Sequence, residues 1–163
     1  MDIKKIKSNR IIPSSAFSVP KSKIKQYDAS NKKKPEVGDL IFGEVIKLGH
    51  HKYIQNQSAR LHTLNIGTRS VFVFGNRYAP DQFEGLVPDS FTEHLDLFSQ
   101  GGIVGEVKTQ NHLISAPTRI RVLGYICDAE GKVINTRNYI LLQPKNTTRK
   151  KRGAKVILCI GTS

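Results

Sequence analysis

Cysteine and long apolar runs are scarce in this sequence. Only two cysteines, Cys127 and Cys159, occur among its 163 residues. They lack a Cys-x-x-Cys partner and lie in apolar runs, so we expect reduced core thiols, with neither a disulfide nor a metal. No apolar run reaches the roughly 18 residues of a membrane-spanning helix, and the charged N-terminus does not resemble a signal peptide. The sequence therefore predicts a cytoplasmic protein without membrane contact.

Sequence motifs of catalysis and metal binding are also absent. None of the five histidines belongs to a His-Glu-x-x-His motif, and no Gly-x-Ser-x-Gly nucleophile elbow occurs. Gly131-Lys132 precedes Val133, whereas a P-loop lysine is followed by the Ser or Thr that binds Mg²⁺. We therefore predict that this chain is not an enzyme, has no catalytic residue or metal site, and binds no cofactor.

Acidic residues are half as frequent as basic ones, and the formal net charge is +13. Residues 1–36 hold 10 basic and 3 acidic residues, residues 145–163 hold 6 basic and no acidic ones, and residues 37–144 hold 10 of each. Basic proteins commonly bind nucleic acid, so we expect any such binding to be weak, non-specific and carried by the flanks. If the central part contributes, its strand-borne arginines would form a local patch: Arg69, Arg77, Arg119 and Arg121.

The segment of residues 1–36 is rich in Lys, Ser and Pro and shows no sustained helical or strand period. We therefore expect a basic arm that is mostly disordered. The alternative is that a few apolar residues hold part of this arm on the rest of the protein. The candidates for such contacts are Ile11, Ile12, Phe17 and Val19.

Residues 37–144 are expected to form one mainly β domain. Short apolar stretches are separated by turns that contain Gly, Pro or Asn. One segment, residues 89–102, favours a short helix, because Ser90 and Glu93 would form a capping box and a Gly-Gly pair would end it. Many short strands and one short helix predict a small β-barrel. The expected strands span residues 39–48, 51–56, 59–64, 68–75, 83–88, 102–109, 118–128 and 132–142.

A short internal repeat lies in this domain. Residues 42–50 (FGEVIKLGH) and 104–112 (VGEVKTQNH) share Gly-Glu-Val and a histidine seven residues after the glycine. Two strand sets with the same glycine bend would build a barrel with pseudo-twofold symmetry. Three shared adjacent residues also arise by chance, so both interpretations stay open.

The densest polar stretch is the loop of residues 74–85 (FGNRYAPDQFEG). In one interpretation it forms the rim of a pocket, where an arginine binds an anion beside a carboxylate. In the other it is a structured surface loop in which Arg77 pairs with Asp81 or Glu84 and the aromatic rings pack inward. The candidate ligand-binding residues are Arg77, Asp81, Gln82 and Glu84.

The last part of the sequence combines a basic linker, residues 145–155, with an apolar strand that runs into Gly-Thr-Ser, residues 156–163. A short apolar strand leading into a glycine turn is how a P-loop begins. The stretch KVILCIGTS resembles the opening of the variant P-loop of dethiobiotin-synthetase-type nucleotide-binding proteins. In that family Gly-Thr is followed, several residues later, by Gly-Lys-Thr. The residues that match the first part of the motif are Gly161, Thr162 and Ser163.

The resemblance extends in outline to uncharacterised bacterial proteins with a β-domain in front of such an NTPase domain, through GNRYAPDQFEG, GGIVGEV and APTRIRVLGYICDAEGKVIN. It implies that residues 37–144 are a non-catalytic accessory or regulatory domain, cut before the nucleotide site. The missing NTPase domain would be its partner, and ATP and Mg²⁺ would belong to a full-length parent. Two alternatives stay open: a stand-alone nucleic-acid-binding β-barrel module with basic arms, and an enzyme that uses the loop of residues 74–85.

Overall fold

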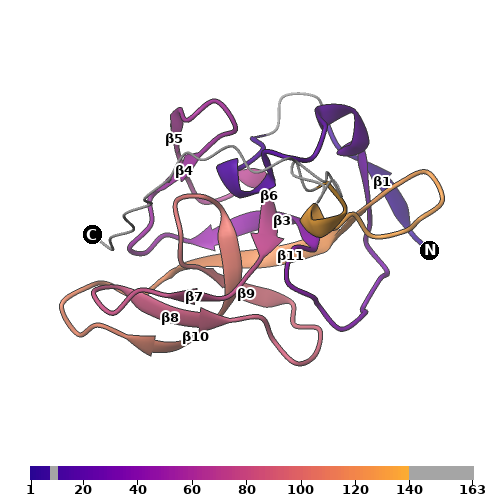
Figure 1. The fold of residues 1–163 in the computed structure, drawn as a ribbon. Helices are drawn as coiled ribbons and strands as arrows, with labels where there is room; N and C mark the ends of the chain where they lie inside the picture. The colour runs from indigo at the N-terminus through magenta and orange to yellow at the C-terminus, as the bar shows by residue number, and fades with distance from the viewer. Residues whose placement is uncertain (8–10, 140–163) are drawn as a thin grey trace, which may run out of the picture.

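The computed structural model describes residues 1–7 and 11–139, which form a mainly β structure (Figure 1). This confirms the predicted fold class. The strands are β1 (Ile3–Lys5), β2 (Gln26–Asp28), β3 (Leu40–Lys47), β4 (Tyr53–Gln55), β5 (Leu61–Thr63), β6 (Arg69–Phe74), β7 (Arg77–Tyr78), β8 (Phe83–Leu86), β9 (His94–Leu97), β10 (Ile103–Gln110) and β11 (Thr118–Cys127). Three short 3₁₀-helices accompany them: η1 (Ser14–Ala16), η2 (Lys21–Lys23) and η3 (Thr136–Tyr139).

Five strands pair in a closed ring, in the order β3, β6, β10, β9, β11 and back to β3. β10 runs parallel to β6, and the other pairs of the ring are antiparallel. β8 and β7 extend the sheet from β10, and β2 and β1 extend it from β11. The strands predicted for residues 51–56 and 59–64 are present as β4 and β5, which pair with each other in a separate two-stranded sheet (Figure 1).

Inward-facing residues of the ring strands form its core. Ile41 and Val45 of β3 point inward, because alternate residues of a strand share a face. Gly43 lies between them, and a Cβ at this position would be 2.7 Å from the Cγ2 atom of Ile120. The glycine therefore allows β3 to approach the core closely. The cluster comprises Ile41, Val45, Ile54, Leu64, Phe72, Phe74, Leu95, Leu97, Val104, Ile120 and Tyr125.

The N-terminal segment, residues 1–7 and 11–36, packs on the outer face of the ring. Leu40 and Phe42 of β3 point outward and are covered by this segment. The buried residues that it contributes are Ile6, Ile12, Ala16, Val19 and Ile24. β2 also pairs with β11, and β1 pairs with β2. The segment therefore belongs to the fold through both apolar contacts and strand pairing.

This arrangement differs from the disordered arm expected for residues 1–36 and agrees with the alternative. Ile12 and Val19 are buried, and Ile11 packs against the inner core cluster, whereas Phe17 is 61% exposed. The segment gives no periodic signal because its elements are only three residues long. Single apolar residues separated by polar ones fill the outer face of the ring instead.

The prediction of a helix for residues 89–102 is wrong, because this segment contains strand β9 (His94–Leu97). β9 pairs with β10 on one side and with β11 on the other, and so closes the ring. Leu95 and Leu97 are both fully buried, and their spacing of two residues matches the period of a strand. A helix this short is only marginally stable by its own capping and propensity. Backbone pairing on two sides therefore outweighs the local helix signal.

The strand predicted for residues 132–142 needs correction. Only Val133 and Asn135 of this segment form isolated β-bridges, η3 follows them, and residues 140–142 lie outside the described part. The repeat strands β3 and β10 flank β6, with β3 antiparallel and β10 parallel to it. The pseudo-twofold relation between them stays a prediction.

Candidate functional site

In the loop of residues 74–85, Arg77 forms hydrogen bonds with other residues of the protein. Nη1 of Arg77 donates hydrogen bonds to the Phe98 carbonyl oxygen, just after β9, and to Oε1 of Gln82 at 3.1 Å. Burial lowers the pKa of Arg77. Glu84 instead accepts a hydrogen bond from Oγ1 of Thr109 at 3.1 Å, and Asp81 is exposed. The structure thus brings Arg77 and Gln82 together, and no ion pair joins Arg77 to either acid within the described residues. Gln82 and Glu84 line a pocket of about 270 Å³ beside β10, and Arg77 and Asp81 are not among its described lining residues.

A buried histidine lies beside this arginine. The His51 side chain packs edge-on against the rings of His50 and Phe83, at centroid distances of 4.9 and 5.9 Å. Its Nε2 atom has no hydrogen-bond partner among the described residues. Burial, His50 and Arg77 together lower the pKa of His51 to about 4. The imidazole is therefore neutral near pH 7 and belongs to the packing of the fold.

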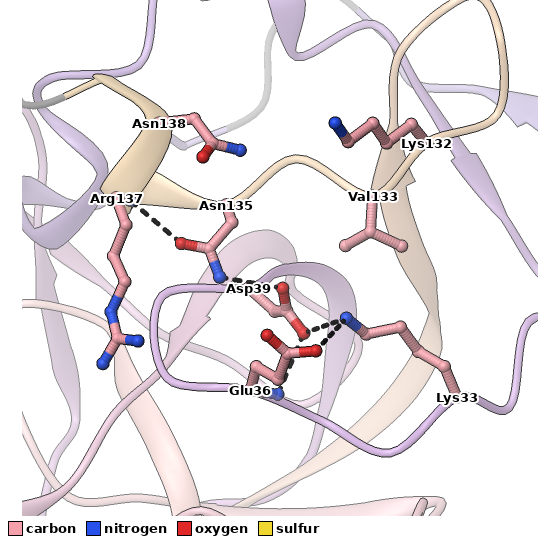
Figure 2. Close-up of a pocket in the computed structure, with 8 residues that line it drawn as sticks. All are labelled: Lys33, Glu36, Asp39, Lys132, Val133, Asn135, Arg137 and Asn138. Atoms are coloured by element: carbon pink, nitrogen blue, oxygen red, sulfur yellow. Dashed lines mark hydrogen bonds and ion pairs between the residues drawn. The ribbon is translucent and has the colours of Figure 1, made fainter.

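A larger pocket, the Asp39 pocket, has a volume of about 420 Å³ and lies between the chain before β3 and η3 (Figure 2). In Figure 2 the acidic side chains lie beside the Lys33 amine, and the Lys132 amine and the Asn138 amide point toward one another at the opposite edge. Two carboxylates and three cations line the pocket, so its charges nearly cancel. Its main residues are Lys33, Glu36, Asp39, Lys132, Asn135 and Arg137.

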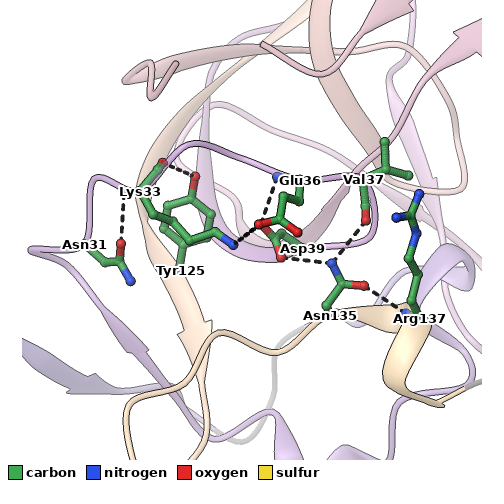
Figure 3. A network of polar contacts seen from close by, with 8 residues as sticks. All are labelled: Asn31, Lys33, Glu36, Val37, Asp39, Tyr125, Asn135 and Arg137. Atoms are coloured by element: carbon green, nitrogen blue, oxygen red, sulfur yellow. Dashed lines mark hydrogen bonds and ion pairs between the residues drawn. The ribbon is translucent and has the colours of Figure 1, made fainter. Parts of the chain in front are cut away.

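Asp39 is the centre of a polar network in this pocket (Figure 3). The residue is 1% exposed, and its Oδ2 atom is 2.9 Å from both the Lys33 Nζ atom and the Glu36 backbone nitrogen. Its Oδ1 atom accepts a hydrogen bond of 3.0 Å from Nδ2 of Asn135. Partial burial favours a neutral Lys33, but the Asp39 and Glu36 carboxylates outweigh it and raise the pKa of this lysine. Every oxygen of the buried carboxylate is thus satisfied from within the protein.

The network is completed by Tyr125, whose hydroxyl donates a hydrogen bond of 3.1 Å to the Lys33 carbonyl oxygen. Burial, with a smaller effect of Asp39 and Glu36, raises the pKa of Tyr125. Asn135 also donates a hydrogen bond of 3.1 Å to the Val37 carbonyl oxygen. These contacts fasten the chain before β3 to the turn after β11. We interpret the Asp39 pocket as a structural clamp.

The lysines of the N-terminal segment fall into two groups. Lys32, Lys33 and Lys34 each lie within 4 Å of a carboxylate outside the lysine run. Lys4 pairs with Asp2 at 3.1 Å. The second group has no acidic partner within residues 1–7 and 11–139 and is exposed. It comprises Lys5, Lys21, Lys23 and Lys25.

The strand arginines of the ring, in contrast, are paired. Arg69 and Arg121 both contact Glu44, at 2.8 and 3.1 Å. Arg119 lies 2.6 Å from Asp96. The local arginine patch that the sequence suggested is therefore present in part, but neighbouring carboxylates compensate much of its charge.

Another pocket, the Tyr27 pocket, has a volume of about 390 Å³ and lies where the N-terminal segment meets β3 and β6. The rings of Tyr27 and Phe42 contact each other there, with centroids 5.1 Å apart. No acidic residue is among the described residues that line it. The pocket therefore combines aromatic surface with positive charge. Its main residues are Lys5, Lys7, Tyr27, Phe42, Thr68 and Arg69.

Two of the unpaired lysines, Lys5 and Lys25, lie at or beside this pocket. Lys5 lines it, and the next residue, Ile6, donates a backbone hydrogen bond of 2.8 Å to the Lys25 carbonyl oxygen. Lys5 and Lys25 therefore lie on adjacent chains beside Tyr27. We take the Tyr27 pocket with these lysines as the candidate functional site. Sequence reasoning located the positive charge in this segment but missed the pocket, for which the only signal was an aromatic residue within the basic stretch KIKQYD.

Other predicted features give no site in the described part of the chain. Within residues 1–7 and 11–139, no group of three His, Cys, Asp or Glu side chains is placed to hold a metal. Cys127 is buried and unbonded, and burial raises the pKa of its thiol, as expected for a core residue. Cys159 and the partial P-loop residues Gly161, Thr162 and Ser163 lie outside the described residues.

Comparison with known proteins does not assign the chain to a family. No family model, curated protein or solved structure matches it. Among the described residues, no helix has both the length and the apolar character needed to span a membrane. The function must therefore be argued from the geometry of the site.

Proposed function

We propose that this protein is a non-catalytic binding module for nucleic acid and that the Tyr27 pocket, with the lysines beside it, is the binding site. The observation that carries the proposal is the group of exposed lysines without an acidic partner on one packed segment. Such lysines attract phosphates and release counterions when a nucleic acid binds. A carboxylate partner would offset that attraction, as it does for the ring arginines.

The pocket favours nucleic acid over an anionic lipid surface, the other polyanion that exposed lysines attract. Phe17 is exposed on the same segment and could enter a bilayer. A lipid surface, however, makes no use of a walled pocket with an aromatic side chain and cations. A base and its phosphate need both, because bases stack on aromatic rings while basic side chains follow the backbone.

The experiment is a binding titration of the full chain with a labelled single-stranded oligonucleotide of about 12 nucleotides. The double variant Lys5→Gln/Lys25→Gln should bind about tenfold more weakly at low salt, and its salt slope should fall by about 1 to 2, since two phosphate contacts are lost. Fluorescence anisotropy over a range of salt concentrations measures both effects.

The matched control is Lys108→Gln, because Lys108 is an exposed lysine that pairs with Glu106 at 2.8 Å. This variant should bind as the unaltered chain does. Binding to anionic vesicles without binding to the oligonucleotide would contradict the proposal and favour a membrane surface. An equal loss in both variants would show that only overall charge matters.

The second candidate is an accessory domain of a P-loop NTPase, and it is supported by the resemblance of residues 156–163 to a P-loop opening. We propose it only for a longer parent that supplies the nucleotide site. Coding sequence after Ser163 should then contain Gly-Lys-Ser or Gly-Lys-Thr within about ten codons in one reading frame, as P-loop spacing requires. Absence of the motif from all three frames would contradict this candidate.

A further inference from the structure

The Tyr27 pocket has the size and lining of a binding site for a single nucleotide unit. Its volume is about 390 Å³, and its aromatic part is formed by the Tyr27 and Phe42 rings, which are tilted by 38°. Phe42 is only 7% exposed, whereas Tyr27 is half-buried and the more accessible of the two. A planar ligand that enters the pocket would therefore meet Tyr27 first. Bases of any sequence can stack on such a ring.

The polar groups around these rings are donors. Oγ1 of Thr68 accepts a hydrogen bond of 3.0 Å from the Asn65 backbone nitrogen, which leaves the hydroxyl proton free to donate. Arg69 also lines the pocket, but its Nε atom donates a hydrogen bond of 2.8 Å to Glu44, which compensates much of its charge. Lys5 is also among the residues that line the pocket. Base carbonyl and phosphate oxygens are the acceptors that match these groups.

We propose that the Tyr27 pocket binds one unpaired base and its phosphate, so that the preferred substrate class is single-stranded nucleic acid. This inference rests on the proposed function and adds a preference to it. A base in a duplex is paired and stacked, and it reaches such a pocket only after leaving the stack. The exposed lysines, in contrast, attract the phosphates of single and double strands alike.

The experiment compares two labelled ligands with the full chain, a single strand and a hairpin duplex with the same number of phosphates. The unaltered chain should bind the single strand more tightly. Tyr27→Leu should weaken single-strand binding about tenfold and leave duplex binding unchanged, since it removes one stacking contact. Tyr27→Phe keeps the ring and should bind as the unaltered chain does. The double variant Lys5→Gln/Lys25→Gln should weaken the binding of both ligands.

A measurement on the unaltered chain keeps the test valid if Tyr27→Leu fails to fold. Uridine monophosphate should compete with the single strand at concentrations where ribose 5-phosphate does not, because only the former carries a base. Equal competition, or equal binding of single strand and duplex, would overturn the unpaired-base inference and leave the nucleic-acid proposal standing. Binding of neither ligand would overturn both.

Discussion

The Asp39 pocket and the Tyr27 pocket have similar volumes, about 420 and 390 Å³, but they differ in how their charges are satisfied. In the Asp39 pocket, Lys33 contacts two carboxylates, and one of these is buried and fully hydrogen-bonded. In the Tyr27 pocket no acid is among the described lining residues, and of the lining cations Arg69 pairs with Glu44 outside the pocket. When the charges of a pocket are compensated within the protein, binding of an ion adds little favourable electrostatic energy. When cations line a pocket without acids, binding of an anion does add such energy.

The same distinction divides the N-terminal segment. Its run of three lysines, Lys32 to Lys34, contacts acids of the neighbouring loop and of the chain before β9. These contacts join the end of the segment to the body. Within residues 1–7 and 11–139, Lys5, Lys21, Lys23 and Lys25 lack such partners and lie exposed at the surface. Position relative to carboxylates, rather than lysine content, therefore separates the structural part of the segment from the part available to a ligand.

The largest expected effect comes from breaking the compensated pocket. Asp39→Ala should lower the free energy of unfolding by about 3 to 5 kcal/mol, because it leaves one N–H of the Asn135 amide and the Glu36 backbone N–H without their acceptor and Lys33 without its closest carboxylate. Chemical denaturation of the full chain measures the change.

Asp89→Ala is the matched control, since Asp89 also pairs with a lysine of the run, at 3.6 Å, but is fully exposed. Its stability should equal that of the unaltered chain, because exposed ion pairs contribute little. A similar stability for both variants would show that the Asp39 network does not fasten the segment.

The strands of the ring could be predicted because alternating apolar residues and glycine turns encode them locally, as in β3, β6 and β11. β9 could not, because its identity depends on partners on both sides, one of which, β11, begins 20 or more residues later in the sequence. The N-terminal segment escaped prediction for a related reason. Its apolar residues match an outer face that exists only after the ring has formed.

The candidate site was predictable only in part. The excess of basic residues in residues 1–36 is visible in the sequence, but the separation into paired and unpaired lysines is not, because Glu93 and Asp89 lie more than 50 residues after the lysines they contact. The predicted ligand loop contained a real contact between Arg77 and Gln82. That contact holds β7 near the end of β9 rather than facing a pocket of cations.

The next largest effect concerns His51, which is buried without an acidic neighbour. The pKa of His51 is about 4 in the folded state and 6.5 for an unperturbed histidine, as in the unfolded chain, so the unfolded chain binds more protons between these pH values. Stability should therefore fall as the pH decreases from about 6.5 to about 4, by about 3 kcal/mol in total for this group. Chemical denaturation at several pH values measures this slope.

His51→Phe tests the assignment, because phenylalanine keeps an aromatic ring between His50 and Phe83 and cannot take up a proton. The part of the pH dependence that belongs to His51 should disappear in this variant. His112→Phe serves as the control, since His112 is exposed, and should keep the slope of the unaltered chain. An unchanged slope in His51→Phe would assign the pH dependence to other groups.

The smallest expected effect tests whether compensated arginines are inactive toward the ligand. Arg121→Gln removes a cation from the outer face of the ring, but Glu44 keeps its contact with Arg69 at 2.8 Å. The free energy of unfolding should change by less than about 0.5 kcal/mol, as for other exposed ion pairs, and oligonucleotide affinity by less than about twofold, because no phosphate contact is lost. The titration used for Lys5→Gln/Lys25→Gln measures the affinity under identical salt conditions. A loss as large as in that double variant would place the outer face of the ring within the binding surface, and acidic partners would then no longer distinguish structural cations from ligand-binding ones.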